Sequence, residues 1–150
     1  MGALMTAEGQ LKSFITRFAP ANQSLIRALR RAMRRRLPGA NELVYDNYNF
    51  LVIAYCPTKK PSDSYFSIAP DRNGASLSFG FNGTRIDDPS GLLQGKGASN
   101  RYLRVDSARV LERPEVAALI ASSIAVSKPM GESRGELIVR SISPKQRPRR

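Results

Sequence analysis

The sequence contains no histidine, no tryptophan and only one cysteine, Cys56. Without an imidazole the chain cannot form a Ser-His-Asp or Cys-His catalytic arrangement, because both use histidine to move a proton near neutral pH. One cysteine and no histidine cannot supply the ligands of a usual zinc site. The sequence therefore excludes the commonest hydrolases and zinc enzymes, and it predicts no catalytic residue, no metal and no cofactor.

Long apolar runs are also missing, since no segment approaches the ~18 apolar residues that a membrane-spanning helix needs. A lone cysteine cannot form an internal disulfide, which is typical of a reducing compartment. A length of 150 residues suits one domain. We therefore expect a cytoplasmic single-domain protein with no membrane partner.

Acidic residues are scarce at both ends of the chain. Residues 1–37 carry eight basic side chains and one acidic side chain, and residues 128–150 carry seven basic and two acidic side chains. Residues 38–127 carry nine of each sign. The net charge of +12 is thus concentrated on two segments, which indicates a polyanionic partner better than a high isoelectric point alone.

The hydrophobic pattern predicts an α+β fold. Apolar residues recur at helical spacing in residues 8–18, 20–37 and 114–127. About five strands are expected between the helices, over residues 43–46, 48–56, 64–69, 75–82 and 101–105, because tight turns separate these runs. Strands joined in this way form an antiparallel sheet, and the two N-terminal helices and the C-terminal helix are expected to cover one of its faces.

The domain is expected to span residues 1–127. From Lys128 onward the composition is rich in Gly, Ser, Pro, Lys and Arg, which predicts a basic and mostly disordered tail over residues 128–150. The apolar run Glu136–Arg140 is an exception within this tail. It could add an edge strand, dock on a partner or, through Leu137–Val139, form a homodimer.

Several short segments carry a resemblance to a known family. They are Leu37-Pro38-Gly39-Ala40, Glu42-Leu43-Val44-Tyr45, Gly95-Lys96-Gly97 and the strand Arg101–Val105. With the order of elements, they resemble the YdhG-like family of bacterial domains of unknown function over roughly residues 8–127. The resemblance implies a compact α+β domain with a curved antiparallel sheet.

Some relatives in that family are described as frataxin-like iron chaperones. Such a role needs clustered carboxylates, because hard cations prefer oxygen ligands. The predicted first two helices offer only Glu8, and the second helix is covered with arginine. The sequence therefore does not favour an iron site.

The strongest candidate for binding is a set of basic side chains. Five arginines fall on one face of the second helix, where guanidinium groups could grip phosphates, and three more lie in the tail. They are Arg27, Arg30, Arg31, Arg34, Arg35, Arg147, Arg149 and Arg150. The alternative is a solvated helix face and a soluble tail, since arginine is a good helix former.

A second candidate is a small-ligand pocket. The Gly95–Gly97 loop lacks the Walker pattern, but it could place Lys96 above polar residues of the early strands. The candidate ligand-binding residues are Tyr45, Asn47, Tyr48, Lys96, Gly97 and Arg101. Packing and a plain surface loop are the alternative interpretation.

Three functional hypotheses follow. The first is a non-enzymatic binding domain of the YdhG-like kind, with an unknown ligand. The second is a nucleic-acid-associated protein that uses the arginine helix and the tail; the absence of tryptophan and of a recognition motif makes such binding backbone-directed. The third is an enzyme of unknown type that uses Lys96 and a tyrosine.

Overall fold

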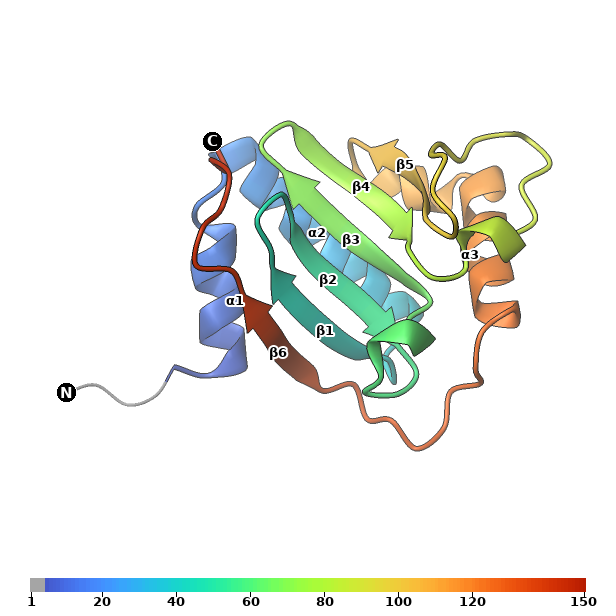
Figure 1. The fold of residues 1–150 in the computed structure, drawn as a ribbon, viewed down its shortest axis with the longest axis horizontal. Helices are drawn as coiled ribbons and strands as arrows, with labels where there is room; N and C mark the ends of the chain where they lie inside the picture. The colour runs from blue at the N-terminus through green and yellow to red at the C-terminus, as the bar shows by residue number, and fades with distance from the viewer. Residues whose placement is uncertain (1–4) are drawn as a thin grey trace.

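The computed structural model describes residues 5–150 as one α+β unit (Figure 1). The chain runs through two helices, five strands, a third helix and a sixth strand. The elements are α1 (Ala7–Ile15), α2 (Pro20–Arg36), β1 (Asn41–Asp46), β2 (Leu51–Cys56), η1 (Pro61–Asp63), β3 (Phe66–Asp71), β4 (Gly74–Phe79), η2 (Gly83–Arg85), β5 (Arg101–Val105), η3 (Ala108–Glu112), α3 (Pro114–Ala125) and β6 (Leu137–Ile142).

The six strands form one sheet in the order β5-β4-β3-β2-β1-β6. Strands β1 to β5 are a meander of antiparallel neighbours, as the tight turns predicted. Strand β6 pairs with β1 in parallel. The sheet thus has one strand more than the five predicted, and the extra strand is not antiparallel.

The helices lie on one side of the sheet, but they do not share the covering equally. Helix α2 packs against β3 and β4 and runs behind them in Figure 1. Helix α1 lies beside β6, and α3 packs against η3 at the opposite end of the sheet. Helix α2 is the central element of that layer, and the positions of α1 beside β6 and of α3 against η3 differ from the prediction that the three helices cover the face together.

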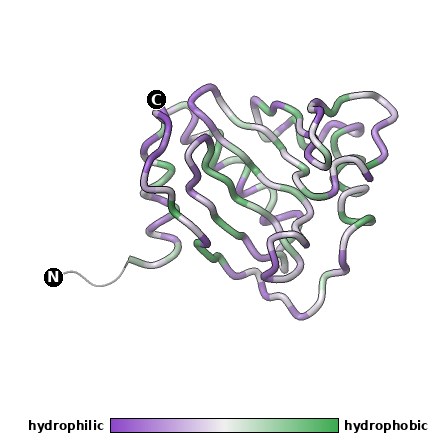
Figure 2. Tube along the Cα trace, viewed as in Figure 1, coloured by the Kyte–Doolittle hydropathy of each residue, from purple (hydrophilic) through white to green (hydrophobic). Residues whose placement is uncertain are grey.

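The two faces of the sheet differ because side chains alternate along each strand. Val44, Ile53, Ile68 and Leu77 point toward the helices and belong to the main core. Figure 2 shows the hydrophobic residues gathered along the strands and α3. On the other face the central strands β3 and β4 carry the small residues Ser67, Ala69, Ser76 and Ser78, and no helix of residues 5–150 covers them (Figure 1).

The prediction of a disordered tail over residues 128–150 is not confirmed. Residues 137–142 form β6, where Leu137 and Val139 pack against the core. The edge of β1 would otherwise have unpaired backbone groups, so a strand there satisfies them. Composition indicated disorder, but the docking partner for this segment lies 95 residues earlier, where Asn41 accepts a hydrogen bond from the backbone of Glu136.

Within residues 5–150, no helix has the length and apolar character to cross a membrane. The domain boundary predicted at residue 1 includes residues 1–4, which lie outside the described residues.

Candidate functional site

Helix α2 carries six arginines and no acidic residue. Arg27, Arg31 and Arg34 follow one another at i, i+4 and i+7, so they form a stripe along one side of the helix. Seven residues of an α-helix advance about 10.5 Å, or two turns. The stripe therefore presents three of the five predicted guanidinium groups in a row.

Carboxylates hold Arg30 more closely than its neighbour Arg34, which lies 3.9 Å from both Glu8 and Glu42. Its Nη2 lies 2.7 Å from Oε1 of Glu8 and 2.9 Å from Oε1 of Glu42, and its Nε donates to Oε2 of Glu42 at 3.0 Å. Only 14% of the Arg30 side chain is exposed. Burial alone would lower the pKa of Arg30, but the hydrogen bonds to Glu42 and Glu8 outweigh burial and raise it. Arg30 therefore anchors the stripe.

Glu42 sits beneath α2 with 4% of its side chain exposed. The phenol of Tyr55 donates a 2.8 Å hydrogen bond to its Oε2. Burial, helped by the nearby charge of Glu42, raises the pKa of Tyr55 well above its ordinary value. This phenol stays protonated and satisfies Glu42, so the buried carboxylate is bound by two groups rather than one.

A groove of about 400 Å³ separates α1 from α2. Leu11 and Ile15 form its apolar part. The cations on its lining are Lys12, Arg27, Arg30, Arg31 and Arg34, and Glu8 is the one carboxylate among the lining residues. We call this feature the α1–α2 groove. Guanidinium and ammonium groups donate hydrogen bonds and accept none. The groove therefore suits an anionic ligand whose oxygen atoms accept hydrogen bonds.

The remaining arginines of α2 face elsewhere. Arg35 and Arg36 line a separate hollow with η3, and Arg36 donates to the carbonyl of Leu111 at 3.1 Å. Of the five arginines predicted to act together, the structure therefore leaves three on the stripe, uses Arg30 as their support and places Arg35 beside another hollow.

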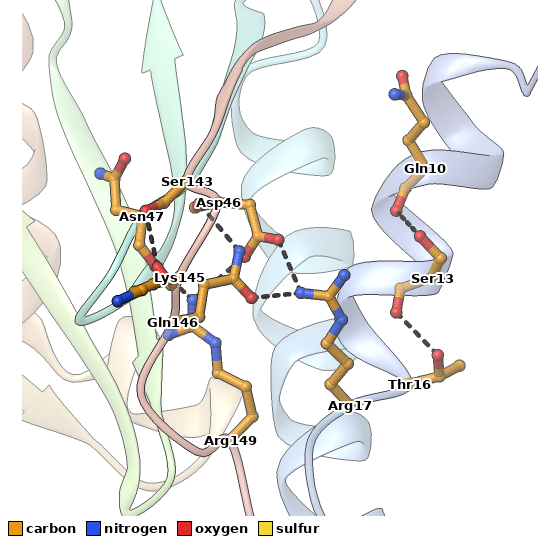
Figure 3. Close-up of polar contacts among 10 residues, drawn as sticks. All are labelled: Gln10, Ser13, Thr16, Arg17, Asp46, Asn47, Ser143, Lys145, Gln146 and Arg149. Carbon is orange, nitrogen blue, oxygen red and sulfur yellow. Dashed lines mark hydrogen bonds and ion pairs between the residues drawn. The ribbon is translucent and has the colours of Figure 1, made fainter.

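Of the three tail arginines, Arg149 is buried and paired with a carboxylate, whereas Arg147 and Arg150 are exposed. The Arg149 side chain is 3% exposed, and its Nη2 donates to Oδ1 of Asp46 at 3.1 Å and to the carbonyl of Asn47 at 2.6 Å. Burial lowers the pKa of Arg149. Figure 3 shows Arg17 reaching the other side of Asp46, where its Nη1 lies 3.1 Å from Oδ2, and also contacting Gln146. Arg149 thus holds the tail in place.

Arg147 and Arg150 remain at the surface. The Arg147 guanidinium lies 5.7 Å from the ring centre of Tyr48, a cation–π contact. Arg150 donates to the carbonyls of Thr16 and Arg17 at the end of α1. These two arginines form a second cationic area at the end of α1 opposite Glu8.

The predicted small-ligand pocket is not assembled. Tyr45 lies on β1, and Asn47 and Tyr48 lie in the turn that follows it, next to the tail. Lys96 and Gly97 lie in the exposed loop before β5, where Arg101 donates to the carbonyl of Gly97 at 2.7 Å. Because three strands separate β1 from β5 and the loops leave opposite ends of the sheet, the two groups do not face one cavity.

A different hollow, which sequence reasoning missed, occupies the uncovered face of the sheet. Its volume is about 590 Å³. Its lining residues are Phe50, Val52, Ser67, Ala69, Asp71, Ser76, Ser78, Gly80, Asn100, Tyr102 and Arg104. We call it the sheet hollow. The signal in the sequence was the alternation of small polar residues on residues 76–80, which shows an outward face but not that the face stays open.

Among residues 5–150, no three carboxylate or thiol side chains gather where they could hold a metal ion. Comparison with models of protein families, with curated proteins and with solved structures finds no match for this chain. The resemblance to the YdhG-like family therefore stays a prediction.

Proposed function

We propose that this chain is a non-enzymatic binding domain, of the YdhG-like kind, that binds the phosphate backbone of a nucleic acid through the α1–α2 groove. The observation that carries the proposal is the stripe of Arg27, Arg31 and Arg34 beside Lys12, with Arg30 fixed behind it by two carboxylates. Arginine suits this task because its planar fork can bind a phosphate through two hydrogen bonds.

The supporting arginine reduces the cost of binding. Arg30 is held by Glu42, which is itself bound by Tyr55, so part of the cationic surface is already ordered before an anion arrives. Ordering a long side chain on binding costs about 0.5–1.5 kcal/mol. Because Glu8 and Glu42 already balance the charge of Arg30, the attraction for a phosphate comes from Lys12, Arg27, Arg31 and Arg34, which line the same groove.

A polymeric anion fits better than a small one. The stripe extends about 10.5 Å along α2, which is longer than one phosphate group. A second cationic area with Arg147 and Arg150 lies at the other end of α1. Successive phosphates of a nucleic acid could contact both areas, whereas a single phosphate would use only one.

The test is a titration of mixed-sequence DNA and RNA against salt concentration. If Lys12, Arg27, Arg31 and Arg34 each neutralise one phosphate, log affinity for duplex DNA should fall against log salt with a slope of about −3.6. That slope corresponds to a loss of about 150-fold between roughly 50 and 200 mM salt.

The variant is Arg27→Glu/Arg31→Glu/Arg34→Glu, which should abolish most of the binding and flatten the slope. The matched control is Arg72→Glu/Lys96→Glu/Arg134→Glu, an equal charge change at exposed residues outside the groove. If both triple variants lose the same affinity, binding follows net charge and the groove is not the site. If the unmodified chain binds no polyanion at low salt, the proposed function is wrong.

A further inference from the structure

We infer that the sheet hollow binds an unpaired base of the nucleic acid, so that the chain prefers single strands to duplexes. This inference rests on the proposed function, because the phosphates bound elsewhere bring the base to the sheet. An exposed sheet face with aromatic side chains is a suitable surface for unstacked bases, since every base has a flat face that can stack on an aromatic ring.

The shape of the hollow follows from strand register. Ser67 of β3 is opposite Ser78 of β4, and Ala69 is opposite Ser76. These four small side chains line the base of the hollow, where Arg104 donates a 3.0 Å hydrogen bond to the hydroxyl of Ser76. Tyr102 is the next residue across from Ser78, on β5, and the wall on the β2 side carries Phe50 and Val52.

Val52 on β2 and Tyr102 on β5 stand on strands that are three positions apart in the sheet, or about 14 Å, and Phe50 lies in the turn just before β2. Four small residues between walls of Phe50 and Tyr102 leave a depression rather than a flat sheet. A volume of about 590 Å³ lies within the usual range for small-molecule pockets, which is about 300–1,000 Å³. The hollow is therefore large enough for a base with part of its sugar.

The polar groups of the hollow suit a neutral ring with hydrogen-bonding edges. Ser78 donates to Oδ1 of Asn100 at 2.9 Å, which leaves the amide NH₂ of Asn100 as a donor. Within residues 5–150, the hydroxyls of Ser67 and Tyr102 make no hydrogen bond to another protein group. A ligand in the hollow can therefore form hydrogen bonds with the hydroxyl of Ser67, the amide of Asn100 and the hydroxyl of Tyr102.

The charge of the hollow points to the base rather than to a phosphate. Arg104 is its one cation, and Asp71 neutralises it, with Nη1 of Arg104 3.2 Å from Oδ2 of Asp71. The hollow is lined only by residues of the segment 38–127, in which the two signs of charge are balanced, whereas the excess charge lies on α2 and the tail. The phosphates belong on the basic surfaces, and the uncharged part of a nucleotide fits here.

A basic entrance lies beside the aromatic wall. Phe50 ends the turn between β1 and β2, and Tyr48 in the same turn is 50% exposed and contacts the guanidinium of Arg147. The backbone N–H of Arg147 donates to the carbonyl of Tyr48 at 2.8 Å, so the tail fixes this turn. A strand whose phosphates contact Arg147 is therefore placed next to the ring of Phe50.

The test compares four fluorescent probes of equal length, about twelve nucleotides, which is within the site size of single-strand-binding folds. They are oligothymidylate, oligouridylate, a mixed duplex and an abasic oligodeoxynucleotide, which keeps the phosphates but has no bases. A stacked base contributes about 5- to 150-fold in affinity, so oligothymidylate should bind more tightly than the abasic strand by that factor. The two homopolymers differ in the 2′-hydroxyl and in the methyl group of thymine, so a difference between them reports on these two groups together.

The variant Phe50→Ala/Tyr102→Leu should remove this difference and leave binding of the abasic strand and the duplex unchanged. Ser67→Leu, which fills the base of the hollow with a larger side chain, should also remove the difference between oligothymidylate and the abasic strand, although it leaves both aromatic rings in place. Phe81→Ala is the matched control, because Phe81 is 53% exposed and does not line the hollow. Melting curves of every variant establish that it is folded.

Equal binding of the abasic strand and oligothymidylate by the unmodified chain would overturn the inference and leave the proposed function standing. An equal loss for all probes in the hollow variants would also overturn it, because these residues would then act through the fold. A dimer in light scattering that Phe50→Ala/Tyr102→Leu converts to a monomer would show that a second copy occupies the hollow. Failure of all four probes to bind would reject the proposed function, and the inference with it.

Discussion

Replacing Glu8 with glutamine is expected to strengthen nucleic-acid binding, even though Glu8 helps to hold Arg30. Its Oε1 lies 2.7 Å from Nη2 of Arg30 and 3.9 Å from Nη1 of Arg34. It is the one carboxylate that lines the α1–α2 groove. Glutamine keeps the shape and can still accept a hydrogen bond from Arg30, so the change removes mainly the negative charge.

The magnitude follows from the distances. A phosphate bound to Arg34 would lie about 6 Å from the Glu8 carboxylate, where two unit charges repel by about 0.7 kcal/mol in water and by up to about 2.8 kcal/mol at an effective dielectric constant of 20. Because 58% of the Glu8 side chain is exposed, the value in water is the better guide. Glu8→Gln should therefore raise affinity about three- to fivefold at low salt.

The assay is a titration of fluorescent oligothymidylate, whose bases do not protonate near pH 4. The hydrogen bond from Arg30 lowers the pKa of Glu8 below its ordinary value of 4.5. As pH falls through that lowered pKa, Glu8 becomes neutral and the unmodified chain should approach the affinity of Glu8→Gln. The stability contributed by ionised Glu8 is present above pH 4.5 and is lost over the same interval, so the two chains should also converge in Tm.

Glu132→Gln is the control, because Glu132 is an exposed carboxylate that does not line the groove. It removes the same charge and should change affinity much less. Unchanged or weaker binding by folded Glu8→Gln at pH 7 would refute the reasoning, since no phosphate could then be bound beside Glu8.

Two further changes test how the tail is held. Arg149→Ala should destabilise the fold by about 2 kcal/mol, or roughly 4–8 °C in Tm, because Asp46 is buried and would keep only Arg17 as its ionic partner. Arg147→Ala at the surface should leave Tm nearly unchanged, and equal Tm values would show that the Arg149 contact adds no stability. Gly135 has φ +77°, and a Cβ there would lie 2.5 Å from the carbonyl oxygen of Pro38. Gly135→Ala should therefore lower the free energy of unfolding by about 1–3 kcal/mol and speed the exchange of backbone amide hydrogens in β6. Gly131→Ala meets no atom within 4 Å and serves as its control; matching exchange rates would contradict the close approach.

The helices and the meander could be predicted from the sequence because their signals are local. Pro20 at the start of α2 and Pro38 after its end mark the helix bounds to within one residue. The predicted strand over residues 48–56 begins instead at Leu51, because residues 47–50 form the turn, closed by a hydrogen bond from the N–H of Asn47 to the carbonyl of Phe50. Aromatic residues in this turn have strand propensity, and the turn overrides it.

The candidate site could be predicted only in part. Helical spacing grouped Arg27, Arg31 and Arg34, but it also included Arg35, which lies beside another hollow. The neutralisation of Arg30 depends on Glu42, which comes from a strand and is brought beneath α2 by tertiary packing. No spacing rule connects the two residues. The sheet hollow was missed because alternation shows which residues point outward, whereas only the packing shows that no helix covers them.

The pairing of β6 with β1 has a consequence for the order of folding. Their contact joins segments 95 residues apart, so it closes the longest loop in the sheet and is expected to form after the local hairpins. Until then the edge of β1 is open, with Leu43 and Val44 next to unpaired backbone groups, and such an edge can recruit a strand of another chain. During synthesis the nascent protein therefore has an aggregation-prone interval, which ends only when residues 137–142 have emerged and docked.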